Sequence, residues 1–188
     1  MKLVLISGAS GVGKTIIAEK ICESHKTFAR AIDMDIMTRN SVIFDKAQLK
    51  NLDGSIQDTT STNFITESQK MKGMLKNVIN RYIEEFAPQD IVIMGNNIMP
   101  NAFYANDFPD VQLHKIVLTC DDLDTHFNRW RENNPKALHK HFVMQREIQD
   151  YLVSHAKVGN ASIIESDKRA ERKIMQIINK KKSLFRHR

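Results

Sequence analysis

The chain of 188 residues lacks several features that would place it in a special class of protein. No apolar run approaches the roughly 18–20 residues that a membrane-spanning helix needs, so we expect no membrane partner. The only two cysteines, Cys22 and Cys120, fall in a predicted helix and a predicted strand, and they have neither metal-ligand spacing nor a disulfide pattern. The first apolar segment begins almost at Met1, which leaves no room for a secretory leader. We therefore expect a cytoplasmic protein with a single domain over residues 1–188.

One short stretch near the start of the chain carries the strongest chemical signal. Residues 8–15 read Gly-Ala-Ser-Gly-Val-Gly-Lys-Thr, the G-x-x-x-x-G-K-T pattern of a phosphate-binding loop. An apolar strand, Leu3–Ile6, precedes it, and a helical pattern beginning near Ile17 follows it. This strand–loop–helix context argues against an accidental glycine-rich turn. We expect seven residues to bind nucleotide phosphates, with Lys14 also catalytic and Thr15 also a Mg²⁺ ligand: Gly8, Ser10, Gly11, Val12, Gly13, Lys14 and Thr15.

The remaining periodicity predicts strands and helices in alternation. Such alternation indicates an α/β fold with a parallel sheet covered by helices on both faces. The predicted strands lie near residues 3–6, 28–32, 91–94, 113–119 and 162–164. The predicted helices lie near residues 66–86, 121–132, 137–157 and 168–188, with a break at residues 133–135.

Polar residues gather where the predicted strands end, which is the edge at which such sheets bind ligands. Asp33-Met34-Asp35 follows the second strand, and period-two alternation would place both carboxylates on one side of the chain. We expect Asp33 to hold Mg²⁺ and Asp35 to orient and deprotonate an acceptor hydroxyl. The alternative is that both residues cap the next helix. Asn96 and Asn97 follow the third strand and are expected to bind substrate.

The third strand lacks the acidic residue that many phosphate-loop proteins place at its end to hold Mg²⁺. Met94 stands there, and Asp90 is at the opposite end of the strand. We therefore expect Asp33 and Asp35 to serve the metal instead.

Arginines supply the expected positive charge around the phosphates. Arg39 could clamp an acidic substrate, although a solvated surface arginine would look the same in sequence. Arg129 and Arg131 lie on a predicted helical lid over about residues 125–140, and Arg146 lies on the helix after it. We expect Arg129 to act in catalysis and Arg131 and Arg146 to bind the nucleotide, the alternative being a salt-bridged surface helix.

The basic character of the chain is confined to its C-terminal end. Residues 168–188 carry a net charge of +8, whereas the rest of the chain carries −2. Such a segment could bind nucleic acid, but more often it is a solvated helix face, and only Phe185 interrupts the charges with an aromatic ring. We therefore expect a core over residues 1–167, a mobile substrate region over about 36–87, and a separate basic helix.

These motifs together resemble the small-molecule kinases with a phosphate-binding loop, a group that includes shikimate, gluconate and nucleoside monophosphate kinases. Asp33-Met34-Asp35 is similar to the D-x-D of shikimate kinases. Residues 96–100, 126–131 and 146–152 resemble the segment after the third strand, the lid and the following helix of the 2-phosphoglycerate kinases. The resemblance implies a three-layer αβα fold with strand order 2-3-1-4-5. It departs from the family pattern at Met94, at Thr38 and at Arg131.

The residues and the resemblance predict a kinase that uses ATP and Mg²⁺ to phosphorylate a hydroxyl of a small anionic molecule. Two alternatives remain: a polynucleotide end kinase, which the basic C-terminal segment would suit, and a nucleotide-binding regulatory ATPase without an acceptor, which Met94 would suit. Neither the acceptor nor the oligomeric state is predicted.

Overall fold

The computed structural model describes residues 1–35 and 60–180. Five strands form one parallel sheet in the order β2-β3-β1-β4-β5, which confirms the predicted fold class. The strands are β1 (Lys2–Ser7), β2 (Phe28–Asp33), β3 (Asp90–Gly95), β4 (Gln112–Thr119) and β5 (Ser162–Glu165). The helices are α1 (Lys14–Ser24), α4 (Ser61–Lys70), α5 (Lys72–Phe86), the short 3₁₀ helix η1 (Ala105–Asp107), α6 (Leu123–Asn133), α7 (His139–Ala156) and α8 (Ala170–Asn179).

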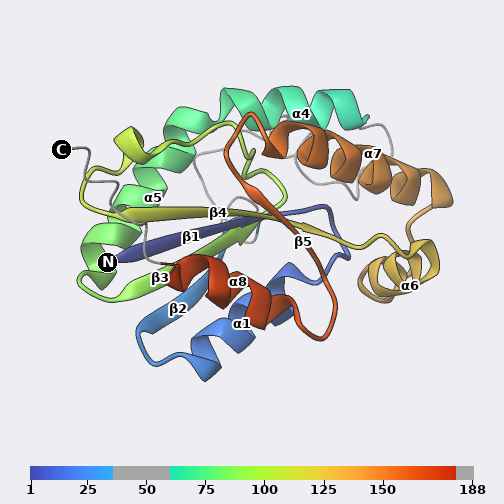
Figure 1. Cartoon of the computed structure of the whole chain (residues 1–188). Coiled ribbons are helices and arrows are strands. Elements are labelled where there is room, and N and C mark those ends of the chain that lie inside the picture. The colour runs from blue at the N-terminus through green and yellow to red at the C-terminus, as the bar shows by residue number, and fades with distance from the viewer. Residues whose placement is uncertain (36–59, 181–188) are drawn as a thin grey trace.

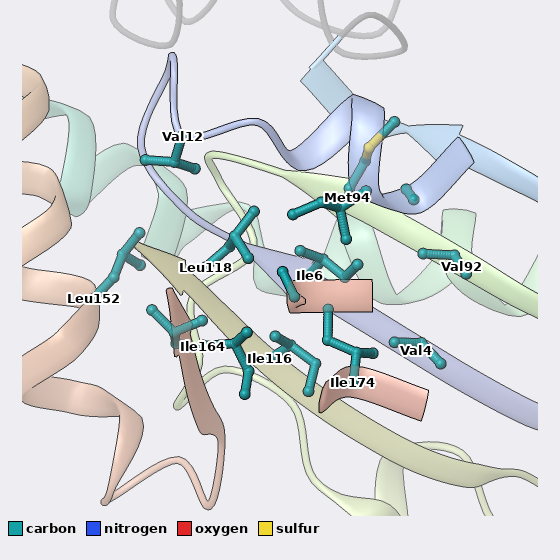
Figure 2. Close-up of a cluster of buried hydrophobic side chains, with 14 of the residues drawn as sticks. Val4, Ile6, Val12, Val92, Met94, Ile116, Leu118, Leu152, Ile164 and Ile174 are labelled. Carbon is teal, nitrogen blue, oxygen red and sulfur yellow. The ribbon is translucent and has the colours of Figure 1, made fainter. Parts of the chain in front are cut away.

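Helices cover both faces of the sheet, so the central strands are buried on both sides. Helices α1 and α8 lie on one face, and α4, α5 and α7 lie on the other (Figure 1). In β1, Val4 and Ile6 belong to the cluster that includes Ile174 of α8 (Figure 2), whereas Leu3 and Leu5 pack with the residues of α5. This explains why β1 and β3 appear in the sequence as continuous apolar runs.

The predicted helix over residues 66–86 is two helices in the structure. Thr60 caps α4 by accepting a hydrogen bond from the backbone N–H of Asn63 at 3.2 Å, so this helix begins five residues earlier than predicted. Met71 ends α4 and begins α5, and its side chain is buried. Helix α4 packs against α7, whereas α5 packs against β3. The break at Met71 therefore allows α4 and α5 to pack against different elements.

The C-terminal helix is shorter than predicted and forms part of the hydrophobic core. Helix α8 ends at Asn179, and residues 181–188 lie outside the described part of the chain. Ile174 and Ile178 are buried in the same cluster as the apolar face of α1. Helix α8 therefore helps to cover the sheet, and only its opposite face presents charge. Within the described ranges, no helix is both long and apolar enough to cross a bilayer.

Candidate active site

The phosphate-binding loop runs from the end of β1 to the start of α1 in a conformation that depends on glycine. Gly11 and Gly13 have φ angles of 86° and 92°, in the left-handed region that side chains disfavour. Helix α1 begins at Lys14, and no side chain caps its N-terminus. The backbone N–H groups of its first turn, together with the helix dipole, therefore offer a binding site for an anion.

Close packing around the loop also requires glycine. A Cβ atom on Gly8 would lie 2.7 Å from the carbonyl oxygen of Leu118 in β4. A Cβ atom on Gly11 would lie 2.7 Å from the Cβ of Trp130, a buried residue of α6. Because these glycines have no side chains, β4 and α6 pack directly against the loop.

Lys14 is buried beneath the loop, and oxygen atoms surround its ammonium group. Nζ donates hydrogen bonds to the carbonyl oxygens of Gly8 and Ala9, both at 3.0 Å, and to Oδ1 of Asn96. Burial lowers the pKa of Lys14, and the negative charges of Asp35 and Asp33 oppose that shift. The two carboxylates predicted for metal and acceptor are thus close enough to act on this ammonium group.

The structure corrects the predicted geometry of Asp33 and Asp35. Strand β2 ends at Asp33, and the backbone is helical at Met34 and Asp35. Oδ1 of Asp33 accepts a hydrogen bond from the backbone N–H of Asp35 at 2.9 Å, which is a helix-capping contact. The expectation of an extended chain with period-two alternation from Asp33 to Asp35 was therefore wrong, and Oδ1 of Asp33 makes the contact of a capping residue.

Asn96 hydrogen-bonds both Asp35 and Lys14. Its backbone N–H donates to both carboxylate oxygens of Asp35, at 2.9 and 3.0 Å, while its side-chain oxygen accepts from Lys14. Asn97 is buried beside it, with Oδ1 only 2.8 Å from the position that a Cβ of Gly95 would take. The turn after β3 thus brings the Asp35 carboxylate and the Lys14 ammonium into contact with the same residue, Asn96.

The end of β3 carries no carboxylate, in keeping with its sequence. Met94 is buried in the core, and Asp90, at the start of the strand, accepts a hydrogen bond from the backbone N–H of Lys2 at 2.6 Å. In phosphate sites, Mg²⁺ is usually held by one or two protein oxygens together with the phosphates. Thr15 is exposed on the first turn of α1, and its hydroxyl and the carboxylate of Asp33 are oxygen donors of the kind that this ion binds.

Residues 1–35 and 60–180 contain no group of three or more His, Cys, Asp or Glu residues that would enclose a metal by itself.

The three predicted lid and nucleotide arginines have different surroundings. Arg129 donates from Nη1 to Oγ of Ser166 at 3.3 Å, and this nitrogen lies 3.9 Å from the place of a Cβ on Gly13, beside the loop. Arg131 is exposed and donates to the backbone carbonyl of Ala137. Arg146 donates to the carbonyl oxygen of Cys120 at 2.6 Å. Arg129 thus lies against the loop, whereas Arg131 contacts backbone in its own segment, and Arg146 contacts the backbone of Cys120 and, at 3.1 Å, Nδ1 of His126. Arg39, the fourth predicted arginine, lies outside the described residues.

Two further side chains contact the loop at Ser10. Gln145 of α7 accepts a hydrogen bond from the backbone N–H of Ser10 at 2.9 Å through Oε1. His126 of α6 bonds the carbonyl oxygen of Ser10 at 2.8 Å through Nε2. The N–H of Ser10 therefore faces α7, and its C=O faces α6.

The sequence carried a signal for Gln145 that the prediction did not use. His141, Gln145 and Gln149 recur every four residues on the buried face of α7. A buried polar side chain needs a partner, so such a row among apolar residues indicates a contact with another element.

Solved structures with a similar fold include kinases of small molecules. A shikimate kinase from Acinetobacter baumannii, in complex with shikimate, is 13% identical with a TM-score of 0.57, and the match covers 95% of this chain and 90% of that one. A gluconokinase from Sinorhizobium meliloti 1021 is 11% identical with a TM-score of 0.55, covering 93% and 90%. A shikimate kinase from Bacteroides thetaiotaomicron is 16% identical with a TM-score of 0.51, covering 94% and 96%.

No protein-family model and no curated protein matches the sequence. The structural likenesses establish the fold of these phosphate-loop kinases, with its five parallel strands in the order 2-3-1-4-5. They leave the 2-phosphoglycerate kinase resemblance without confirmation.

Proposed function

We propose that the protein is an ATP- and Mg²⁺-dependent kinase that phosphorylates a hydroxyl group of a small anionic molecule. One observation carries the proposal. The ammonium of Lys14 and the carboxylate of Asp35 are both hydrogen-bonded to Asn96, at the edge of the sheet where the loop begins. A kinase needs this pair, because one group neutralises charge on the transferred phosphoryl and the other receives a proton from the acceptor. The fold shared with shikimate kinase and gluconokinase supports it.

The chain's own groups divide the work of the reaction. The backbone N–H groups from Gly11 to Thr15 and the ammonium of Lys14 would bind the phosphates of ATP. The acceptor oxygen attacks the γ-phosphorus, the bond from that phosphorus to the β-phosphate oxygen breaks, and ADP leaves. Asp35 takes the proton of the acceptor hydroxyl. Thr15 and Asp33 would hold Mg²⁺, which when bound neutralises charge on the phosphate oxygens.

Arg129 is the arginine best placed to stabilise the transferring phosphoryl group, since its guanidinium lies beside Gly13. We propose that closure of a lid is restricted to the residues after Trp130. His126 and Trp130 are buried against the loop, so the part of α6 up to Trp130 would have to break these contacts in order to move. Arg131 comes directly after that part, and a closing movement there would carry it toward the nucleotide.

The test is a screen for transfer of phosphate from ATP to candidate acceptors. Purified protein with ATP and Mg²⁺ is offered sugar acids, phosphorylated sugars, 2-phosphoglycerate and related hydroxy acids, and products are identified by mass spectrometry. Lys14→Ala is the control, and product formed equally by that variant would reject the assignment. ATP binding with no product across the panel would favour a regulatory ATPase.

Phosphorylated oligonucleotide ends in the same screen would favour the polynucleotide kinase. Because α8 is part of the core, deleting it would unfold the protein and could not test this alternative. Replacing three exposed basic residues with Gln, Lys168 and Arg169 just before α8 and Arg172 on it, removes charge and leaves the buried face of the helix intact. A polynucleotide kinase should then lose affinity for oligonucleotides, together with part of its salt dependence.

A further inference from the structure

Both backbone hydrogen-bonding groups of Ser10 are bonded to side chains from outside the loop. The N–H donates to Gln145 at 2.9 Å, and the C=O accepts from His126 at 2.8 Å. His126 is completely buried and Gln145 nearly so, while Ser10 lies 116 residues from the first and 135 from the second along the chain. The phosphate-loop pattern includes neither side chain. This peptide unit is therefore oriented by α6 and α7.

The hydrogen bonds determine which ring nitrogen of His126 carries the proton. The carbonyl oxygen of Ser10 can only accept, so Nε2 must carry the hydrogen. On the other side of the ring, Nη1 of Arg146 lies 3.1 Å from Nδ1, and because arginine can only donate, Nδ1 must be the bare acceptor. A second proton would place an N–H opposite the N–H of Arg146. The arrangement therefore requires a neutral imidazole.

The groups that face His126 from each neighbouring element favour the same neutral form. Arg146 of α7, Lys14 of α1 and Arg129 of α6 are all cationic, and the ring of Phe142 packs edge-on at 5.1 Å between centroids. Burial is the largest cause that lowers the pKa of His126, and these three cations lower it further, while the bond to Ser10 acts in the opposite direction.

We propose that His126 and Gln145, with Arg146 behind the imidazole, are positioning residues that hold Ser10 so that the following N–H groups face a bound phosphate chain. The inference deepens the proposed function by assigning three side chains to the preparation of its nucleotide site. The physical need arises from the neighbouring glycines. Gly11 and Gly13 give the loop freedom to adopt many conformations, and each bond at Ser10 removes part of that freedom before the ligand arrives.

Paired variants separate positioning from a general contribution to folding. His126→Phe keeps an aromatic ring against Phe142 but removes the donor to Ser10, whereas His126→Gln keeps a donor near the position of Nε2. Gln145→Met removes the bond to the Ser10 N–H. Gln149→Met is its matched control, because Gln149 lies one turn further along α7, is equally buried at 3% exposure, and bonds Cys120 instead of the loop.

The first measurement needs no nucleotide. Hydrogen exchange at the Ser10 amide is expected to accelerate at least about tenfold in Gln145→Met and to remain near the wild-type rate in Gln149→Met. The second measurement is the affinity for ATP by calorimetry. We expect a roughly tenfold loss in His126→Phe and Gln145→Met, equal to about 1.4 kcal/mol, with recovery toward wild type in His126→Gln. Melting temperatures verify that each variant is folded.

The third measurement follows His126 itself by NMR. The imidazole should be neutral at pH 7 in the wild type, as its two hydrogen bonds require, and its pKa should rise in Arg146→Met because a positive charge beside Nδ1 is removed.

Wild-type affinity for ATP and unchanged exchange at Ser10 in folded His126→Phe and Gln145→Met would overturn the proposal, as would an imidazole whose pKa does not respond to Arg146→Met. A protein that binds ATP but phosphorylates no acceptor would contradict the proposed function and leave these measurements fully interpretable.

Discussion

The backbone N–H of Asn96 donates to both carboxylate oxygens of Asp35, at 2.9 and 3.0 Å. The two residues are 61 positions apart and follow neighbouring strands, β2 and β3. This bond fixes the position of the carboxylate, and the side chain of the same asparagine contacts Lys14. The geometry of the proposed reaction therefore depends on the turn after β3 as much as on the phosphate-binding loop.

Replacing Lys14 with Ala should lower phosphoryl transfer by roughly 10²–10³-fold, because the site loses the positive charge that meets the transferring phosphoryl group. Initial rates with the acceptor found in the screen give the measurement, and circular dichroism gives the control for folding. Transfer at the wild-type rate would remove Lys14 from the mechanism.

Asp35→Asn should reduce kcat by roughly 10²-fold or more while leaving the affinity for ATP near normal, because the amide keeps an oxygen for the Asn96 N–H but cannot accept the acceptor's proton. The comparison is Asp33→Asn, which should weaken the dependence on Mg²⁺ instead. An unchanged kcat in Asp35→Asn would show that another group receives the proton.

Gly95→Ala should disturb the site without removing a charged group. The new Cβ would lie 2.8 Å from Oδ1 of Asn97, 3.1 Å from Oδ1 of Asp35 and 3.2 Å from the Cβ of Met34, so these neighbours must move. We expect a loss of about 1–3 kcal/mol in the free energy of unfolding and a roughly tenfold lower kcat. Denaturant titration and steady-state kinetics measure the two effects, and a fully active, fully stable variant would contradict this packing.

Gly73→Ala is the matched glycine substitution and should stabilise the protein. Gly73 is exposed in the first turn of α5, and a Cβ there meets no atom within 4 Å. Because alanine loses less backbone entropy than glycine on forming a helix, we expect a gain of about 0.5–1 kcal/mol, or roughly 1–4 °C in melting temperature. A lower melting temperature would indicate that α5 is not helical at this residue.

Cys22 should react slowly with thiol reagents at neutral pH. Burial raises its pKa to about 11, and the charges of Glu19 and Glu23 add to that shift. Since the reactive form is the thiolate, iodoacetamide labelling at pH 8 should be at least about tenfold slower than for free cysteine, and it should speed up as the pH rises toward 11. Mass spectrometry of the peptide that contains Cys22 follows the labelling. Rapid reaction at pH 8 would show that the thiol is not shielded.

Local signals in the sequence determined most of the fold. The phosphate-binding loop is a pattern of eight consecutive residues, and the strands β1 and β3 are continuous apolar runs because both of their faces are buried. The absence of a carboxylate at the end of β3 could also be read directly, since Met94 occupies that position. Each of these features is encoded by residues close together in the chain.

Tertiary packing alone decided how the site is assembled. No periodicity predicts that Ser10 bonds His126 and Gln145, or that Asn96 bonds both Lys14 and Asp35, because these partners meet only after the helices and strands have packed. Packing also divided residues 61–86 at Met71, because α4 packs against α7 whereas α5 packs against β3. Strand β2 ends at Asp33, whose side chain caps the next turn. The sequence by itself located the phosphate chemistry, whereas hydrogen bonds between distant residues determined its geometry.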